Sequence, residues 1–293
     1  VLPTAIWFPA KTNNHIAHHK LGEALKLQNK TVAAAKQYSE ALRIKPDIFI
    51  THLNLGIILR DEGKLNEAKD YFSRALRLKP DRAEPHFELG ITLEKQGDFD
   101  EAIRHYLEVL QIKPDYAKAH NNLGIILARQ KKDKEAIFHL YEAIRIDPNH
   151  ADAYCNLGII YANQRNIEKA ILHYKKALYL NPNMAQALYN LSWILTSCED
   201  KKFRNGEEAV KLAEKLYKIA QNNQPLALDA LAAAYAETGK FDEAVTTAKK
   251  ALELALKQGS NKLVLTLKKR LQLYQEERPY RQKQSYIPQI GIR

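Results

Sequence analysis

A period of 34 residues dominates this sequence and constrains its fold more than any other feature. A Leu-Gly pair, an alanine and a proline each recur in step with it over five cycles. The pairs are Leu21-Gly22, Leu55-Gly56, Leu89-Gly90, Leu123-Gly124 and Leu157-Gly158; the alanines are Ala34, Ala68, Ala102, Ala136 and Ala170; the prolines are Pro46, Pro80, Pro114, Pro148 and Pro182. A fixed period of this length is typical of a solenoid of stacked two-helix units, whose function lies in its surface.

Each unit contains two apolar segments with helical spacing, separated by a short turn. In the second unit the first segment carries Leu55, Ile58 and Leu59, and the second carries Phe72 and Leu76. The turn needs a residue in the left-handed conformation, for which glycine is best suited and asparagine next. That place is held by Asn29, Gly63, Gly97, Lys131, Arg165 and Gly239. We therefore expect the fourth and fifth turns to be less well capped.

The order of leucine-glycine, alanine, an aromatic residue and proline resembles the tetratricopeptide repeat family. The aromatic place is filled by Tyr38, Phe72, Tyr106 and Tyr174, with Leu140 as the exception. The resemblance covers about Asn14 to Ala255. It implies an all-α fold, a right-handed superhelical solenoid of about seven helix-turn-helix units with a C-terminal capping helix.

The register predicts the boundaries of the units. An apolar N-terminal extension (1–14) precedes an array over 15–255, and the final unit carries on to 258. A capping helix (259–278) and a basic, irregular tail (279–293) follow. The units are 15–48, 49–82, 83–116, 117–150, 151–184, 185–224 and 225–258. The sixth unit has a turn lengthened by the segment 196–205 before Gly206 restarts its second helix.

Charge and cysteine content narrow the function classes. The net charge is +11, and residues 257–293 carry +7 of it, so the basic character belongs to the C-terminal helix and tail. The two cysteines, Cys155 and Cys198, lack metal-ligand spacing, so no metal site or disulfide framework is predicted. No run of about 18 apolar residues occurs, and no membrane span is predicted. The N-terminus lacks both an initiator methionine and the basic start of a signal peptide, and is compatible with a mature form or a fragment.

The sixth position of each unit is the main candidate for ligand contact. In the tetratricopeptide family, this position points into the concave groove lined by the first helices. Here it is occupied by Lys20, Asn54, Glu88, Asn122, Asn156 and Asn190. The asparagines resemble the ladder in the repeats of the O-linked N-acetylglucosamine transferase, where such residues hold a peptide backbone. An asparagine amide offers two donors and one acceptor, which suit the N–H and C=O groups of a peptide backbone. Equivalent helices of adjacent repeats lie about 10 Å apart, which is about three residues of an extended peptide, so one asparagine per repeat would contact about every third peptide residue. The alternative is a merely solvated asparagine.

Two further lines follow the register. The ninth position carries Glu23, Ile57, Ile91, Ile125, Ile159 and Trp193. We favour the interpretation that these side chains pack the first helices against each other over the alternative of an exposed apolar strip. Trp193 is nevertheless included among the predicted groove residues. Histidines occupy the fourth position (His18, His52, His86, His120) and the twenty-third (His105, His139, His173). Equivalent residues in neighbouring repeats are about 10 Å apart, too far to share a metal ion. Structural histidines are favoured over a pH-sensitive array.

These patterns favour a non-catalytic scaffold that binds an extended peptide or protein segment in its concave groove. No phosphate loop or nucleophile elbow occurs, so neither an enzyme nor a cofactor is predicted. A second interpretation is an accessory domain of a larger protein. The stretches 11–22, 190–209 and 231–244 resemble repeats that accompany membrane-anchored glycosyltransferases of the transmembrane-and-tetratricopeptide type.

Other partners follow from the two ends of the chain. A third interpretation is self-assembly into a homo-oligomer. In it, the apolar N-terminus or the tail Tyr286–Ile292 enters the groove of a neighbouring chain, or the groove of its own chain. Specific nucleic-acid binding is not expected, because the basic C-terminus lacks interleaved aromatic residues. Acidic proteins and anionic membrane surfaces are equally compatible with it. The sequence assigns no compartment: a cytoplasmic protein and the periplasmic or exported part of a membrane-anchored parent both fit.

Overall fold

The computed structural model describes residues 14–221 and 224–281 of the chain. Every regular element in this part of the chain is a helix. They are α1 (His15–Leu27), α2 (Thr31–Ile44), α3 (Phe49–Asp61), α4 (Leu65–Leu78), α5 (Ala83–Gln96), α6 (Phe99–Ile112), α7 (Ala117–Arg129), α8 (Asp133–Ile146), α9 (Ala151–Asn163), α10 (Ile167–Leu180), α11 (Ala185–Ser197), a 3₁₀ turn η1 (Lys201–Phe203), α12 (Gly206–Ile219), α13 (Pro225–Glu237), α14 (Phe241–Lys257) and α15 (Asn261–Gln275). The predicted all-α repeat solenoid is confirmed.

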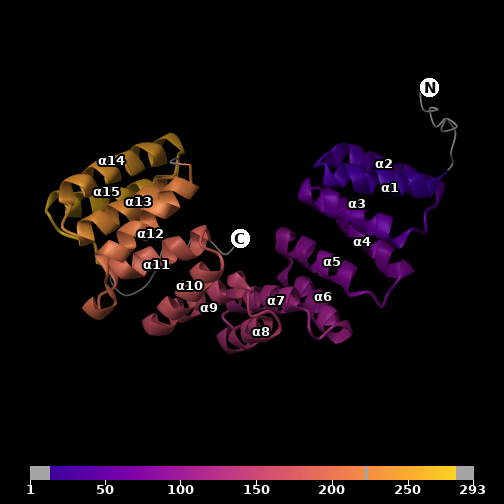
Figure 1. Ribbon diagram of the computed structural model, residues 1–293, viewed down its shortest axis with the longest axis horizontal. Coiled ribbons are helices and arrows are strands. Elements are labelled where there is room, and N and C mark those ends of the chain that lie inside the picture. Colours follow the sequence, from indigo (N-terminus) through magenta and orange to yellow (C-terminus); the bar gives the residue numbers. More distant parts are fainter. Residues whose placement is uncertain (1–13, 222–223, 282–293) are drawn as a thin grey trace, which may run out of the picture. The chain divides into compact units, whose positions relative to one another are not determined.

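The helices form antiparallel pairs, and each pair packs against the next within two compact units (Figure 1). The N-terminal unit ends at Ala119 and the C-terminal unit begins at His120. The N-terminal extension up to residue 13 and the tail from 282 lie outside the described residues. None of the helices in the described part has the length and apolar composition needed to cross a bilayer.

The close crossing of the two helices in a pair depends on the glycine of each Leu-Gly motif. A Cβ atom added at Gly90 of α5 would lie only 2.5 Å from Cε1 of Tyr106 in α6. The same geometry recurs between Gly56 and Phe72. The rings of Tyr106 and Phe72 are fully buried. The partner of the repeat glycine is therefore the aromatic residue of the second helix.

The turns within the pairs adopt the left-handed conformation at the expected positions. Asn29, Lys131 and Arg165 have φ values of 58°, 61° and 62°. Gly63, Gly97 and Gly239 have φ values of 80°, 83° and 76°. The conformation therefore persists where the sequence offers a residue that tolerates it poorly.

Replacing Lys131 by glycine is expected to raise the free energy of unfolding by about 0.5–1 kcal/mol. A residue with a Cβ atom is strained at positive φ, and the relief exceeds the entropy that glycine adds to the unfolded chain. Urea unfolding followed by circular dichroism measures the change. Lys132→Gly is the matched control, because Lys132 has a φ of −89° and gains nothing from glycine. A K131G variant no more stable than the wild type would contradict this account of the turn.

The sixth pair departs from the repeat where the sequence lengthens its turn. α11 ends at Ser197, η1 follows, and α12 begins at Gly206. The side chain of Asn205 caps α12 by accepting a hydrogen bond from the backbone N–H of Glu208 at 3.1 Å. At the end of the array, α15 buries the side chains of Leu267 and Tyr274.

Candidate functional site

The sixth-position residues of the N-terminal unit form polar contacts with the preceding repeat. Nζ of Lys26 in α1 donates to Oδ1 of Asn54 in α3 at 3.4 Å. In the same arrangement one repeat later, Arg60 of α3 forms an ion pair with Glu88 of α5. Both contacts join the twelfth position of one repeat to the sixth position of the next. Sequence reasoning missed the twelfth position, although Lys26 and Arg60 lie one period apart.

Glu88 is mostly enclosed in this arrangement. Its side chain is 18% exposed and that of Arg60 is 12% exposed, whereas Lys20 is 74% exposed. Burial raises the pKa of the Glu88 carboxyl above its usual range, and the Arg60 guanidinium offsets only part of this effect. The sixth position of the third repeat therefore carries a carboxylate that is already paired with Arg60.

In the C-terminal unit, the ladder asparagines of α7 and α9 are joined by hydrogen bonds. Nδ2 of Asn156 donates to Oδ1 of Asn121 at 3.0 Å, and Nδ2 of Asn121 donates to Oδ1 of Asn122 at 3.2 Å. Asn121 is buried, and the two ladder residues are half-buried. Asn121 was not predicted to take part. Its bridging place holds the amides of two successive repeats in one network, which we call the amide surface (Asn121, Asn122 and Asn156).

Asn190 and Trp193 of α11 do not lie on an open groove wall. Both side chains are fully buried. The guanidinium carbon of Arg270 lies 4.2 Å from the centroid of a Trp193 ring, and Tyr280 packs edge-on against the same side chain at 6.2 Å. The burial of Asn190 differs from the exposed groove position expected for it, whereas packing was the favoured interpretation for Trp193. A ligand contact at Trp193 would require Tyr280 or Arg270 to move.

The isoleucines of the ninth position also differ in how far their side chains are buried. Ile57, Ile91 and Ile125 are half-buried, whereas Ile159 is 1% exposed. The side chains thus serve packing to different extents along the array. They do not form a continuous exposed apolar strip.

The histidines form contacts inside each repeat, between the fourth and twenty-third positions. Nδ1 of His86 lies 2.9 Å from Nδ1 of His105, and Nδ1 of His120 lies 2.9 Å from Nδ1 of His139. In the first repeat, Gln37 takes the place of the second histidine at 2.7 Å from Nδ1 of His18. Burial, and next the neighbouring His86, lower the pKa of His105 to about 4. The two histidine lines, considered separately in the sequence, are thus one line of pairs that clamp the helices of a repeat together.

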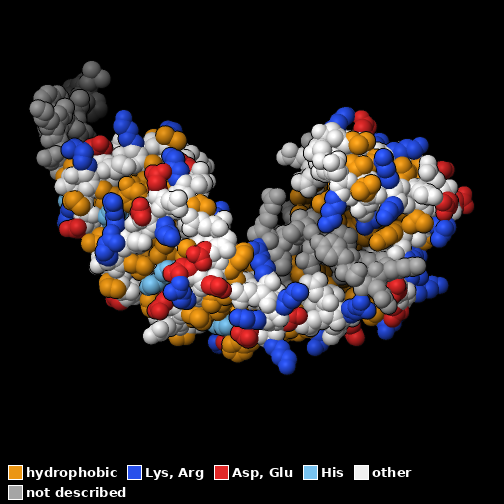
Figure 2. Space-filling view, turned by 180° about the vertical axis from the view of Figure 1, so that it is seen from behind, with side chains coloured by type: hydrophobic (Ala, Val, Ile, Leu, Met, Phe, Trp, Pro, Cys, Tyr) orange, Lys and Arg blue, Asp and Glu red, His pale blue; other side chains and the backbone are white. Residues whose placement is uncertain are grey.

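The remaining titratable side chains do not gather into a metal site within the described residues. Within residues 14–221 and 224–281, no three His, Cys, Asp or Glu side chains come close enough together to hold a metal ion. Cys155 is buried, and burial raises the pKa of its thiol to about 12. On the face shown in Figure 2, lysine and arginine side chains are interspersed with acidic ones.

The repeats match known family models over more than half of the chain. Models described as tetratricopeptide repeat match residues 151–184 and 227–262, and a model described as TPR repeat matches 56–97, 95–131 and 126–164. The chain belongs to the tetratricopeptide repeat family. No curated protein sequence matches it significantly.

Solved structures of other tetratricopeptide repeat (TPR) proteins resemble this chain. YrrB, described as a TPR protein with an unusual peptide-binding site, is 26% identical with a TM-score of 0.50, covering 61% of this chain and 92% of its own. MamA is 24% identical with a TM-score of 0.51, covering 56% of this chain and 96% of its own. PilF from Pseudomonas aeruginosa is 20% identical with a TM-score of 0.61, covering 71% and 92%. The last two show the fold alone.

Proposed function

We propose that this chain is a non-catalytic scaffold that binds an extended peptide or protein segment along the inner face of its first helices. The amide surface of α7 and α9 carries the proposal. It presents half-buried carboxamides from two successive repeats, held in place by a buried third amide. YrrB, a relative of similar fold with a described peptide-binding site, supports the same class of ligand.

The chemistry of the amide surface suits a peptide backbone. Asn156 uses one of its two donor hydrogens on Asn121, so its second N–H and its oxygen are available to a ligand. A peptide group needs one acceptor for its N–H and one donor for its C=O, which a single carboxamide supplies. Because the network with Asn121 fixes the amide orientation in advance, less side-chain entropy is lost on binding.

The other predicted contact residues are assigned lesser roles in this proposal. Lys20, Asn54 and Glu88 would contact a ligand on the N-terminal unit, with the charge of Glu88 already balanced by Arg60. Asn190 is fully buried, and Trp193 would join only after Tyr280 or Arg270 moves. The accessory-domain and self-assembly interpretations stay predictions. The two ends of the chain on which self-assembly depends, 1–13 and 282–293, lie outside the described residues.

The test uses peptides selected for binding from a phage-displayed library of random 12-residue sequences. The double variant Asn122→Ala/Asn156→Ala is expected to bind a selected peptide about tenfold more weakly, because each lost hydrogen bond contributes about 0.5–1.5 kcal/mol. Isothermal titration calorimetry measures the affinity, and circular dichroism checks the fold.

The matched control is Asn149→Ala/Asn183→Ala. These two asparagines are also one period apart, but they lie exposed in the loops between repeats. The control is expected to bind as the wild type does. Equal affinity of wild type and N122A/N156A, with the fold intact, would remove the amide surface from the proposal.

A further inference from the structure

The segment that follows the last helix folds back onto the sixth and seventh repeats. After α15, Glu277 adopts a φ of 53° and the N–H of Arg278 donates to O of Leu273 at 2.9 Å, which turns the chain. The residues Arg278–Arg281 then have no helical structure. We call this segment the clasp. Its contacts are with α11, α13 and α15, all inside the C-terminal unit.

Tyr280 of the clasp occupies an aromatic and cationic slot. Its ring meets Trp193 edge-on, with 6.2 Å between ring centroids and 89° between planes. The guanidinium of Arg270 lies 4.7 Å from the Tyr280 ring and 4.2 Å from Trp193, so it is in cation–π contact with both. Arg270 is held by an ion pair with Asp229 of α13, and both side chains are almost fully buried. The slot is thus organised by residues outside the clasp.

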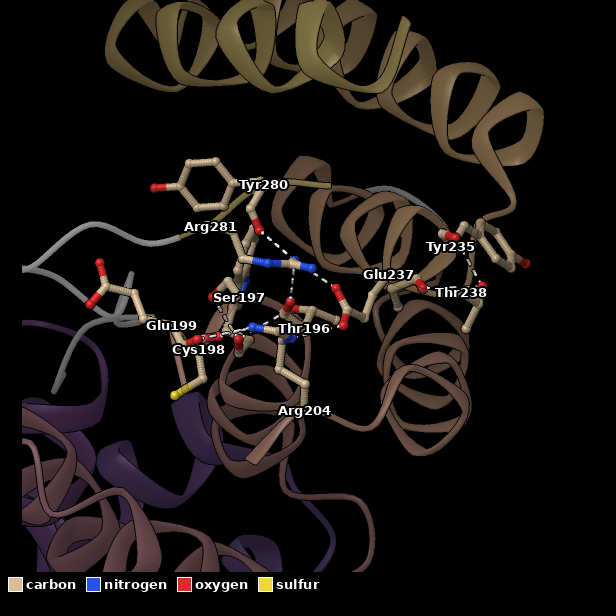
Figure 3. A network of polar contacts seen from close by, with 12 residues as sticks. Thr196, Ser197, Cys198, Glu199, Arg204, Tyr235, Glu237, Thr238, Tyr280 and Arg281 are labelled. Carbon is tan, nitrogen blue, oxygen red and sulfur yellow. Dashed lines mark hydrogen bonds and ion pairs between the residues drawn. The ribbon is translucent and has the colours of Figure 1, made fainter. Parts of the chain in front are cut away.

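Arg281 occupies a second slot, formed by a backbone carbonyl and a carboxylate (Figure 3). Its Nη1 donates to the backbone O of Thr196 at 3.1 Å and lies 2.6 Å from Oε2 of Glu237. The other oxygen of Glu237 accepts from Nε of Arg204 at 3.0 Å. Two arginines from distant parts of the chain therefore share one carboxylate.

The lengthened turn of the sixth repeat builds this second slot. Arg204 lies in that turn, and its Nη1 donates to O of Cys198 at 2.9 Å and to O of Glu199 at 3.1 Å. Glu237 is thereby fixed by the turn independently of the clasp. This gives the inserted residues a role that the repeat pattern alone does not explain.

We propose that these two slots form a receptor for an aromatic residue followed by arginine, and that the clasp is its resident, exchangeable ligand. The partner that displaces the clasp is an extended segment of another protein with the same aromatic–arginine chemistry. Three features support exchange. The clasp is irregular, its anchoring contacts come from two residues, and the Arg281 side chain remains 33% exposed.

The receptor is separate from the amide surface, so the inference goes beyond the function proposed above. Its residues lie on α11, α13, α15 and the lengthened turn, whereas the amide surface lies on α7 and α9. Displacement of the clasp would uncover Trp193, one of the predicted groove residues. The proposal therefore also supplies a reason for the burial of that side chain.

The experiment adds the clasp in trans to the full-length chain. The probe is a fluorescein-labelled peptide with the sequence of residues 276–284, and the host is the variant Tyr280→Ala/Arg281→Ala, whose slots are vacant. Fluorescence anisotropy is expected to show at least tenfold tighter binding to this variant than to the wild type. The wild-type clasp competes because its tether gives it a high effective concentration.

Three controls define the site. Adding Glu237→Gln to the host is expected to weaken binding at least tenfold, because Gln keeps the shape of the side chain but removes its charge. A peptide with alanine at both clasp positions should not bind. The variant N122A/N156A in the same host should bind the probe unchanged, which separates this site from the amide surface.

A spectroscopic readout covers the case in which the double variant is poorly folded. The chain has two tryptophans, so Trp7→Phe leaves Trp193 as the sole reporter. In that background, Tyr280→Ala alone is expected to shift Trp193 emission to longer wavelength, and excess probe should reverse the shift. Absence of probe binding to a folded Y280A/R281A chain, equal binding to the wild type, or a Trp193 emission indifferent to Tyr280 would each overturn the proposal.

Discussion

Replacing Asp229 by alanine is expected to destabilise the C-terminal repeats by about 3–5 kcal/mol, the largest effect of any single substitution considered. The Asp229 side chain is 1% exposed and that of its partner Arg270 is 5% exposed. Removal of the carboxylate would leave a buried guanidinium without a counter-charge. Burial raises the pKa of the Asp229 carboxyl, and the charge of Arg270 opposes that effect.

Urea unfolding of the D229A variant tests this expectation, with Trp193 fluorescence in a Trp7→Phe background as a reporter of α11 and its neighbours. The double variant Asp229→Leu/Arg270→Met is expected to recover most of the lost stability, because apolar residues of similar size often replace a buried ion pair without loss. Glu253→Ala breaks an exposed pair with Lys257 on α14 and should change little. A loss below about 1 kcal/mol for D229A would contradict the role given to the pair.

Lowering the pH from 7 to 5 is expected to destabilise the fold through its histidine pairs. His105 and His139 have pKa values lowered to about 4 by burial and by their histidine partners. In the unfolded chain each would titrate near pH 6.5. The folded state therefore binds fewer protons between these values, so stability is full above about pH 6.5 and falls as the pH approaches 4. Each histidine is expected to contribute about 1–2 kcal/mol of the loss between pH 7 and 5.

The charged groups around the pairs modify this effect without reversing it. His105 faces His86 and lies 4.0 Å from Glu101, with Arg104 and Lys69 adding repulsion. Around His139, the charges of Glu135 and Glu142 favour protonation but do not outweigh burial and His120. The net direction is the same for both pairs.

The first repeat suggests the variant that isolates the effect. His105→Gln/His139→Gln reproduces the arrangement of His18 with Gln37, in which an amide meets the imidazole at 2.7 Å. Urea unfolding at a series of pH values should show a weaker pH dependence for this variant than for the wild type. A wild-type free energy of unfolding that is constant between pH 7 and 5 would rule out the assigned role of the pairs.

The periodic part of the structure was predictable because the same local packing contacts recur in each repeat. The Leu-Gly motif, the aromatic residue and the turn residue each have one local partner. Their spacing therefore predicts the helices, the all-α class and the left-handed turns at Lys131 and Arg165. The contact between the two histidine lines was missed because it joins residues 19 apart across a turn, a distance that is not a multiple of the period.

The burial of the distal groove residues was not predictable from the repeat, for a different physical reason. Asn190 continues the ladder in register, which indicates an exposed position, whereas Trp193 belongs to the ninth-position line, for which packing was favoured. The clasp that covers Trp193 is not periodic, and Arg281 reaches Thr196 across 85 residues of chain. No repeat pattern encodes such a contact. The irregular sequence of the lengthened turn was the one available sign that this end of the array differs.

The central claim, that the inner first helices bind an extended segment, is tested most directly by photo-crosslinking. A library-selected peptide carrying a benzophenone side chain at successive positions would be irradiated with the full-length chain, and the cross-linked residues identified by mass spectrometry. The account predicts cross-links to α7 and α9 around Asn122 and Asn156, lost in the N122A/N156A variant. Cross-links confined to the second helices α8 and α10 would contradict it.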